Sequence, residues 1–270
     1  MLLRSMTKHV RDQNWFAVFL DFLIVVVGIL IAFQITNWNE ARSDARRGHA
    51  YVDRLIIEIE KDLTNLQGLL AYYDAVNASA ERTVELLSQP APKPEKLIIH
   101  AYRATEYSNF KARRATWDEI VSSGNMELLP PVITENSLSG YYDYGDTGLK
   151  LQGRMLDSDY RKRVRRIIPH KIQHSIRRCG DKVPHDQDAP ALSIDCDMDA
   201  TESELVDIAA LLKNDPELLR DLRYQFSILG VIRGDLQSLI DGNLYGKNLS
   251  LEELIQALKE SRSDSGREAR

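Results

Sequence analysis

The chain has 270 residues, of which 43% are hydrophobic and 28% are charged, and its formal net charge is -5. This composition is ordinary for a folded protein and excludes a chain that is disordered throughout. The mild negative charge excludes nucleic acid as an expected partner, and the length suits one sizeable domain with an anchor, or two small domains.

The first predicted element is a transmembrane helix over residues 15–38. As a helix, this stretch of about 24 residues measures roughly 36 Å, which is enough to cross a hydrocarbon core of about 30 Å. Trp15 and Trp38 stand at its ends, as in the aromatic belts of membrane interfaces. A signal peptide would have a shorter apolar block and a cleavage site, and a buried core helix rarely stays apolar on all sides. We therefore expect a permanent single-pass anchor in the lipid bilayer.

One face of this anchor carries Asp21, Val25, Gly28 and Ala32, which follow the i, i+4, i+7, i+11 spacing of a helix. Gly28 and Ala32 form a small-xxx-small pair that permits close contact between helices in lipid. We expect a protein partner or a second copy to pack there. Asp21 fits either a functional carboxylate inside the membrane or a carboxylate at headgroup level, near the positive end of the helix.

The anchor is predicted to continue into a long helix, amphipathic in pattern, over residues 39–87. Asp62 interrupts its apolar seam. Two arrangements fit the seam: packing in the core of the chain's own domain, or an inter-subunit coiled coil that would also recruit a partner. The seam residues are Leu55, Ile59, Leu66, Leu69, Tyr73, Val76, Ala80, Val84 and Leu87.

Residues 88–260 are predicted to form a helical domain, followed by a disordered tail over 261–270. The segment Ser88–Lys96 is rich in proline and indicates a loop. Helix caps are expected at Thr116 with Glu119 and Gly124, at Thr201 with Glu204, and at Ser250 with Glu253. No stretch alternates with period two, so the predicted fold class is mostly α.

Two blocks of the sequence carry a family resemblance. The first is "FLIVVVGILIAFQITNWNEAR", with Asp21 before it and Asn37-Trp38-Asn39-Glu40 near its end. The second is "TWDEIVSSGNMELL", from Thr116 to Leu129, followed by the pair Tyr141-Tyr142. Together they resemble a family of bacterial membrane-anchored proteins catalogued as a domain of unknown function, although the family more often has Glu where this chain has Asp21. The resemblance implies a single anchor and a helical domain, and it implies no reaction.

The segment Tyr160–Arg178 is strongly basic. It could bind an anionic lipid surface, a polyanion or an acidic partner. It also reads as an amphipathic helix with a solvated basic face, because Val164, Ile168, Ile172 and Ile176 recur at helical steps. No nucleic-acid motif accompanies it, so we expect no nucleic acid.

Two places in the sequence contain residue types that bind metal ions. His170 and His174 stand one helical turn apart, with His185 beyond them, but the glutamate of a metalloprotease helix is missing. The acidic loop from Asp195 resembles the start of a calcium loop, then has Ala200 where Gly is required and Val206 where Glu is required. An acidic loop before a helix explains the same residues. We expect no metal and no other cofactor.

No nucleophile elbow, phosphate-binding glycine loop or C-x-x-C motif occurs in the sequence. We therefore expect a non-catalytic, membrane-anchored interaction, scaffold or sensor-like protein, or an accessory subunit of a membrane complex. The alternative is a membrane-tethered metal-dependent hydrolase built around the three histidines and the acidic loop.

The side of the membrane depends on the two cysteines, because lysine and arginine flank the anchor at both ends and the positive-inside rule does not decide. Cys179 and Cys196 flank an irregular loop rich in Pro and Asp that has little to bury. A bridge closing it would contribute roughly 3 kcal/mol and would need an oxidising compartment, whereas two free buried thiols are the alternative. We expect a disulfide, a short cytoplasmic segment over residues 1–14, and a periplasmic domain on the bacterial inner membrane.

Overall fold

The computed structural model describes residues 15–131, 133, 138–180, 192–243 and 249–268. These residues form helices joined by loops and contain no β-strand, which confirms the predicted mostly α class. The helices are α2 (Trp15–Ser88), α3 (Pro94–Arg103), α4 (Ala115–Ser123), the 3₁₀ turn η1 (Met126–Leu128), α6 (Leu138–Asp157), α7 (Asp159–Ile167), α8 (His170–Gly180), α9 (Glu202–Asn214), α10 (Leu218–Ile240) and α11 (Leu251–Glu268).

The chain divides into two compact units, Met1–Tyr51 and Val52–Arg270. Helix α2 runs without a break from Trp15 to Ser88, so it contributes to both units, as the predicted anchor continuing into a long helix requires. The boundary lies at Tyr51 and Val52, so the second part of α2 belongs to the helical domain that we predicted to begin at residue 88. The predicted cytoplasmic segment 1–14 lies outside the described residues.

In the first unit, the apolar side chains of α2 are exposed. Phe22 is 65% exposed, Leu30 62% and Phe33 63%. One candidate membrane span is found among the described residues, a helix that starts at Phe19 and reaches a mean hydropathy of 2.5. This stretch of α2 is long and apolar enough to serve as a membrane anchor.

In the second unit, the seam of α2 is buried by the unit itself. Leu55, Ile59, Leu66 and Tyr73 are each 0% exposed. Of the two predicted arrangements, the structure therefore has the first, in which α2 packs in the core of its own domain. This burial explains why the pattern repeats at steps of three and four without any second chain.

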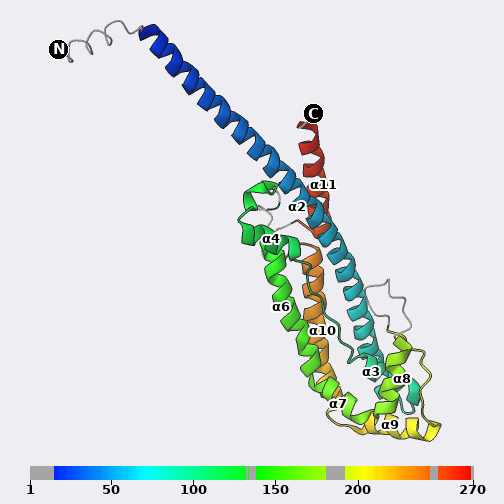
Figure 1. Cartoon of the computed structure of the whole chain (residues 1–270). Helices are drawn as coiled ribbons and strands as arrows, with labels where there is room; N and C mark the ends of the chain where they lie inside the picture. The colour runs from blue at the N-terminus through cyan, green and yellow to red at the C-terminus, as the bar shows by residue number, and fades with distance from the viewer. Residues whose placement is uncertain (1–14, 132, 134–137, 181–191, 244–248, 269–270) are drawn as a thin grey trace, which may run out of the picture. The chain divides into compact units, whose positions relative to one another are not determined.

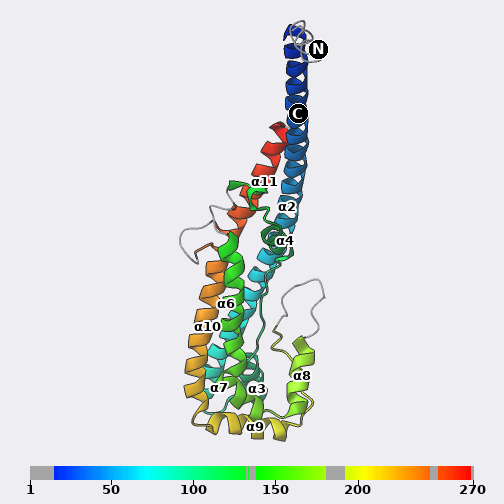
Figure 2. The ribbon, with the colours of Figure 1, turned by 60° about the vertical axis from the view of Figure 1, so that its left-hand side comes forward.

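The remaining helices of the second unit pack around this core. Helix α6 lies along α10, and α7 contacts α3, α6, α9 and α10. Figures 1 and 2 both show α9 crossing the end of the unit beside α3, α7 and α8. The segment between α3 and α4 brings the chain back along the unit, and α6 and α10 then run in opposite directions beside each other (Figures 1 and 2).

Two of the predicted capping boxes are confirmed. Thr201 caps α9: its hydroxyl accepts from the backbone N–H of Glu204, and its own backbone N–H donates to the Glu204 carboxylate. The hydrogen bonds from Lys171 and from Thr201 lower the pKa of Glu204 to about 2. Ser250 and Glu253 exchange the same pair of bonds at the start of α11. Both boxes depend on residues three positions apart, which is why the sequence alone could locate them.

The start of α4 was predicted wrongly. Gly124 ends this helix in the left-handed region at φ 71°, as expected, but the N-cap is Arg114 and not Thr116. Thr116 instead donates from its hydroxyl to Glu58 of α2 at 2.8 Å, and Glu119 pairs with Arg54 of α2. Contacts with α2 replace the local capping box.

The tail also differs from expectation, because α11 continues to Glu268. Lys259 pairs with Glu60 and Arg262 with Asp53, so two ion pairs join this helix to α2. The hydroxyl of Ser263 donates back to the carbonyl of Glu260. These contacts extend the helix through most of the predicted disordered tail, and residues 269–270 lie outside the described part of the chain.

Candidate functional site

Asp62 lies on the buried face of α2 and is 0% exposed. Its Oδ1 accepts a hydrogen bond from Arg113 Nη1 at 2.8 Å. Its Oδ2 accepts from the backbone N–H of Arg113 and from the hydroxyl of Tyr141, both at 2.9 Å. A buried carboxylate is tolerated only when it is paired and hydrogen-bonded, and these three donors provide both conditions.

Glu58 lies one turn before Asp62 on α2. Its Oε1 accepts from the hydroxyl of Thr116 at 2.8 Å and from the backbone N–H of Thr116 at 3.3 Å. Its Oε2 is buried and has no hydrogen-bond partner among the described residues, and the same holds for the hydroxyl of Tyr142. Burial, and then the charges of Glu58 and Asp62, raise the pKa of Tyr142, so its hydroxyl remains protonated.

Aromatic rings close this cluster. Trp117 of α4 stacks on Tyr142 of α6, with ring centroids 5.3 Å apart, and Tyr141 packs edge-on against Tyr142. The second block of the family resemblance and the pair Tyr141-Tyr142 are therefore joined in space, on the segment of α2 that holds Asp62. We call this set the Asp62 cluster: Glu58, Asp62, Arg113, Thr116, Trp117, Tyr141 and Tyr142.

Sequence reasoning missed the role of Asp62 and treated it as an interruption of the seam. The signal was present, because Asp62 stands seven residues after Leu55 and so occupies a core position. A charge at such a position indicates a buried partner. Arg113 and Tyr141 could not have been chosen from the sequence as that partner, because they lie far along the chain.

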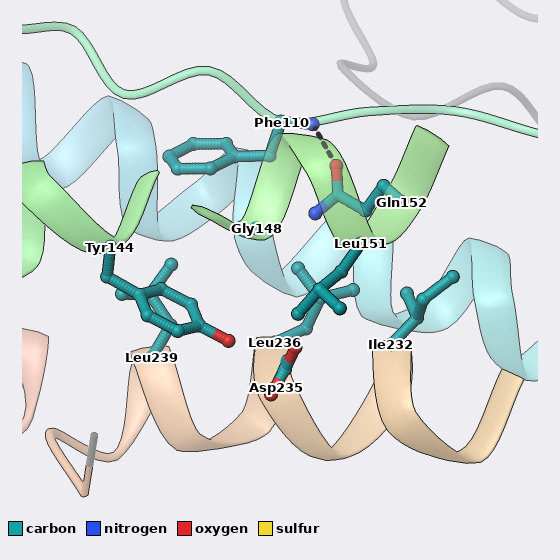
Figure 3. Close-up of a pocket in the computed structure, with 9 residues that line it drawn as sticks. All are labelled: Phe110, Tyr144, Gly148, Leu151, Gln152, Ile232, Asp235, Leu236 and Leu239. Carbon is teal, nitrogen blue, oxygen red and sulfur yellow. Dashed lines mark hydrogen bonds between the residues drawn. The ribbon is translucent and has the colours of Figure 1, made fainter. Parts of the chain in front are cut away.

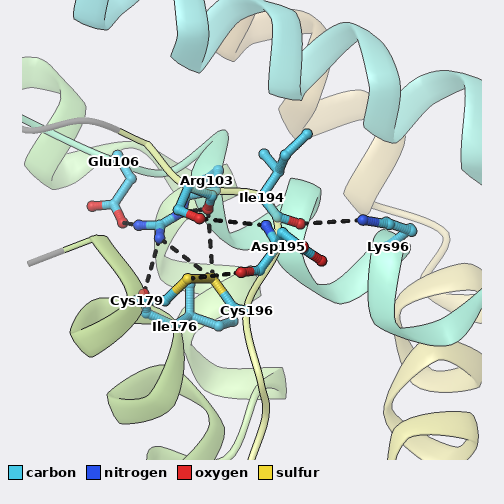
Figure 4. The surroundings of a disulfide bond; sticks show 9 residues. Lys96, Arg103, Glu106, Ile176, Cys179, Ile194, Asp195 and Cys196 are labelled. Carbon is cyan, nitrogen blue, oxygen red and sulfur yellow. Dashed lines mark hydrogen bonds and ion pairs between the residues drawn. A yellow bond between two sulfur atoms is a disulfide. The ribbon is translucent and has the colours of Figure 1, made fainter. Parts of the chain in front are cut away.

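A second buried group is Arg103, at the end of α3, whose side chain is 3% exposed. Its Nε donates to the carbonyl of Ser193, its Nη1 to Glu106 Oε1 and its Nη2 to the carbonyl of Ile176, all at 2.9 Å. Arg103 thus joins α3 to α8 and to the segment that precedes α9 (Figure 4).

The two cysteines lie beside Arg103. Cys179 and Cys196 are at disulfide distance, with their Cα atoms 5.5 Å apart, and Figure 4 shows the bridge against Ile176. The irregular loop between them falls largely on residues 181–191, which lie outside the described part of the chain. The bridge joins the end of α8 to the same segment that Arg103 holds.

The residues of the metal hypothesis are not brought together. His170 and His174 stack with ring centroids 6.3 Å apart on the exposed face of α8. His185 lies outside the described residues. Asp195, within the acidic loop, is exposed, and the described residues contain no group of three or more His, Cys, Asp or Glu that could hold a metal ion. Among described positions, this geometry offers no support for the hydrolase alternative.

A small recess lies between α6 and α10, lined in part by Phe110, Tyr144, Gln152 and Asp235. Gln152 Oε1 accepts from the backbone N–H of Phe110, and the Tyr144 hydroxyl points toward Asp235 (Figure 3). The recess has room for about one water molecule. It is therefore a packing gap and not a substrate site.

The anchor residues lie on exposed turns of α2 in the first unit. Asp21, Gly28 and Ala32 are all exposed, and a Cβ added at Gly28 would meet nothing within 4 Å. The glycine is thus not needed for packing within its own unit. Contact of this face with another helix stays a prediction.

We predict that Asp62→Ala lowers the free energy of unfolding by about 2–4 kcal/mol, because it removes the acceptor of the buried Tyr141 hydroxyl and of the Arg113 backbone N–H. The matched control is Asp74→Ala on the same helix, where an exposed pair with Arg233 is worth about 1 kcal/mol or less. Urea denaturation followed by circular dichroism measures both. Equal losses in the two variants would contradict a special role for Asp62.

Comparison with known families accounts for part of the chain. The model of DUF6090, described as a family of unknown function, matches residues 21–163. The match begins at Asp21, takes in the whole Asp62 cluster and ends on α7, before the two cysteines. No curated protein and no solved structure matches the chain. The matched residues make up more than half of the sequence, so the chain belongs to DUF6090, a family of unknown function.

Proposed function

We propose that this chain is a non-catalytic interaction protein, held in a bacterial inner membrane by the first part of α2, with residues 52–270 on the periplasmic side. It would act as a scaffold, a sensor-like module or an accessory subunit of a membrane complex. The proposal has three parts: an anchor, a side of the membrane and a mode of action.

The observation that carries the proposal is the exposed apolar stretch of α2. Residues 22–39 contain no charged side chain and measure about 27 Å as a helix. Their large apolar side chains are exposed along this stretch, including Ile24 at 60% and Ile31 at 54%. Exposed apolar surface on all sides of a helix is unfavourable in water and favourable in lipid.

The side of the membrane is inferred from the cysteine pair. A lasting disulfide requires an oxidising compartment, and the bacterial periplasm is one. Cys179 and Cys196 lie at bonding distance within the second unit, which supports a periplasmic location for that unit.

The non-catalytic role is inferred from how the buried charges are used. Asp62 accepts three hydrogen bonds and Arg103 donates to three acceptors from different segments. Charged groups that are saturated in this way hold segments together and have little capacity left for acid–base or nucleophilic chemistry. Binding of a partner, through the anchor or the domain surface, is the function that such a scaffold supports best.

The proposal predicts that the protein stays in the membrane fraction after a carbonate wash. It also predicts that a phosphatase reporter fused after Arg270, active only in the periplasm, gives signal. The matched control is a fluorescent reporter at the same position that matures only in the cytoplasm and should stay dark. Release by carbonate would reject the anchor, and a bright cytoplasmic reporter would reject the periplasmic domain.

The disulfide is tested separately. We predict that alkylation of the unfolded protein adds no mass without reductant and adds two alkyl groups with it, because Cys179 and Cys196 are the chain's two cysteines. In the control Cys179→Ser, the remaining thiol should be alkylated without reductant. Alkylation of both wild-type cysteines without reductant would contradict the predicted disulfide and would say nothing against the predicted anchor.

Partner binding through the anchor predicts a loss of self-association in Gly28→Leu, because a large side chain keeps helices apart in lipid. The control is Val26→Leu, which lies about 200° around the helix from Gly28 and should change nothing. Cross-linking in membranes compares the dimer yield of the two variants with that of the wild type. The same dimer yield in all three proteins would show that this face is not a contact.

A further inference from the structure

The end of α3 and one face of α7 bring together a set of side chains that the proposed function does not use. Arg161 and Arg165 lie one turn apart on α7 and both reach Thr105: Arg161 Nη1 donates to its carbonyl, and Arg165 Nε donates to its hydroxyl at 2.8 Å. Tyr72 of α2 is 5% exposed, and its hydroxyl lies within electrostatic reach of Glu106, Arg103 and Arg161. Arg177 of α8 lies within electrostatic reach of Tyr102 and Arg165. We call this set the Arg165 cluster: Tyr72, Arg103, Glu106, Arg161, Arg165 and Arg177.

Arg165 is held in one position. Its guanidinium carbon lies 3.5 Å from the centroid of the Tyr102 ring, and its Nη1 donates to the Tyr102 hydroxyl. Its Nη2 is buried, lies 3.5 Å from Glu106 Oε2 and makes no hydrogen bond to any described residue. One buried donor of this fixed guanidinium is therefore left over.

Other donors of the cluster are also unused within the described part of the chain. The side chain of Arg161 donates through Nη1 alone, so its Nε and Nη2 have no acceptor among the described residues. Arg177 is exposed and has no hydrogen bond or ion pair to a described residue. Tyr72 has no acceptor there either, and burial, then Glu106, raise the pKa of its hydroxyl, so it remains a donor.

The charges of the cluster do not balance. Arg103, Arg161, Arg165 and Arg177 carry four positive charges, and among the described residues the one carboxylate that pairs with any of them is Glu106. The carbonyl end of α3 offsets only about half an elementary charge. Burial lowers the pKa of Arg165, Tyr102 and Glu106 act against this, and the charges of Arg161 and Arg177 lower the pKa by smaller amounts.

We propose that the Arg165 cluster binds a phosphate-type oxyanion, with Arg161, Arg165, Arg177 and the Tyr72 hydroxyl as its donors. Guanidinium forks match the oxygens of a phosphate, and an excess of about three positive charges suits a multiply charged anion better than a single carboxylate. The anion is either free phosphate or the phosphate of a lipid headgroup. The binding orients α3, α7 and α8 around one ligand.

The other basic residues of the segment Tyr160–Arg178 differ from those of the Arg165 cluster in how their charges are paired. Arg163 is neutralised by Asp215 and Asp221, and Lys171 by Glu204. Arg166 is exposed, points about 100° around α7 from Arg165 and has no partner among the described residues. It therefore offers a matched control for unspecific attraction of anions by a basic surface.

The experiment uses the full chain in phosphatidylcholine nanodiscs, at constant ionic strength set with chloride. Calorimetric titration with inorganic phosphate, and separately with dihexanoyl phosphatidylglycerol, compares wild type, Arg177→Gln and Arg166→Gln. Arg177 is exposed, so its replacement should leave the circular dichroism spectrum unchanged. We expect saturable binding of one probe, weakened about tenfold or more by Arg177→Gln and unchanged by Arg166→Gln.

The two probes distinguish the sources of the anion. Binding of inorganic phosphate assigns a free anion, and binding of phosphatidylglycerol without binding of phosphate assigns a lipid headgroup. If neither probe binds, or if Arg166→Gln weakens binding as much as Arg177→Gln, the proposal is wrong. A titration of Arg161→Gln serves as a second variant and must weaken binding as well if the cluster is the site.

Discussion

The second unit depends on one buried carboxylate. Asp62 sits at a core position of α2, where an unpaired charge would cost several kcal/mol, and three donors from two other segments compensate it. Arg113 belongs to the segment before α4, and Tyr141 belongs to α6. The carboxylate can be buried only when both segments are in place, so it fixes their register against α2. An apolar residue there would pack equally well in several registers.

The Asp62 cluster and the Arg165 cluster treat charge in opposite ways. Both carboxylate oxygens of Asp62 have donors and its charge is paired with Arg113, although Glu58 Oε2 in the same cluster has no partner among the described residues. Around Arg165, guanidinium groups outnumber the carboxylate of Glu106, and donors are left over in the described part of the chain. The first arrangement joins segments of the fold, whereas the second leaves an excess of positive charge among the described residues to which we propose that an anion binds. This contrast is the physical basis for assigning structure to one cluster and ligand binding to the other.

Whether the sequence could predict a feature depends on how far apart in the chain its interacting residues lie. The capping boxes at Thr201 and Ser250 and the left-handed end at Gly124 depend on neighbours within a few residues, and their positions were found. Thr116 looks the same in sequence as these caps, yet its hydroxyl bonds to Glu58, which lies 58 residues earlier. Rules that use only neighbouring residues cannot take into account a hydrogen-bond partner so far away in the sequence. The seam of α2 was found by its period, but the period does not say whether the chain's own domain or another chain covers it.

The segment 192–199 shows how a part of the chain without helix or strand is held. Arg103 binds the carbonyl of Ser193, Lys96 binds the carbonyl of Ile194 at 3.3 Å, and Cys196 is joined to Cys179. The disulfide stabilises the folded state by roughly 3 kcal/mol for a loop of this length, mainly because it restricts the unfolded chain. The two side chains act instead on the folded state, where they satisfy carbonyl groups that regular structure would otherwise pair. Loss of the bridge would therefore weaken the attachment of this segment to α8 without removing its attachment to α3.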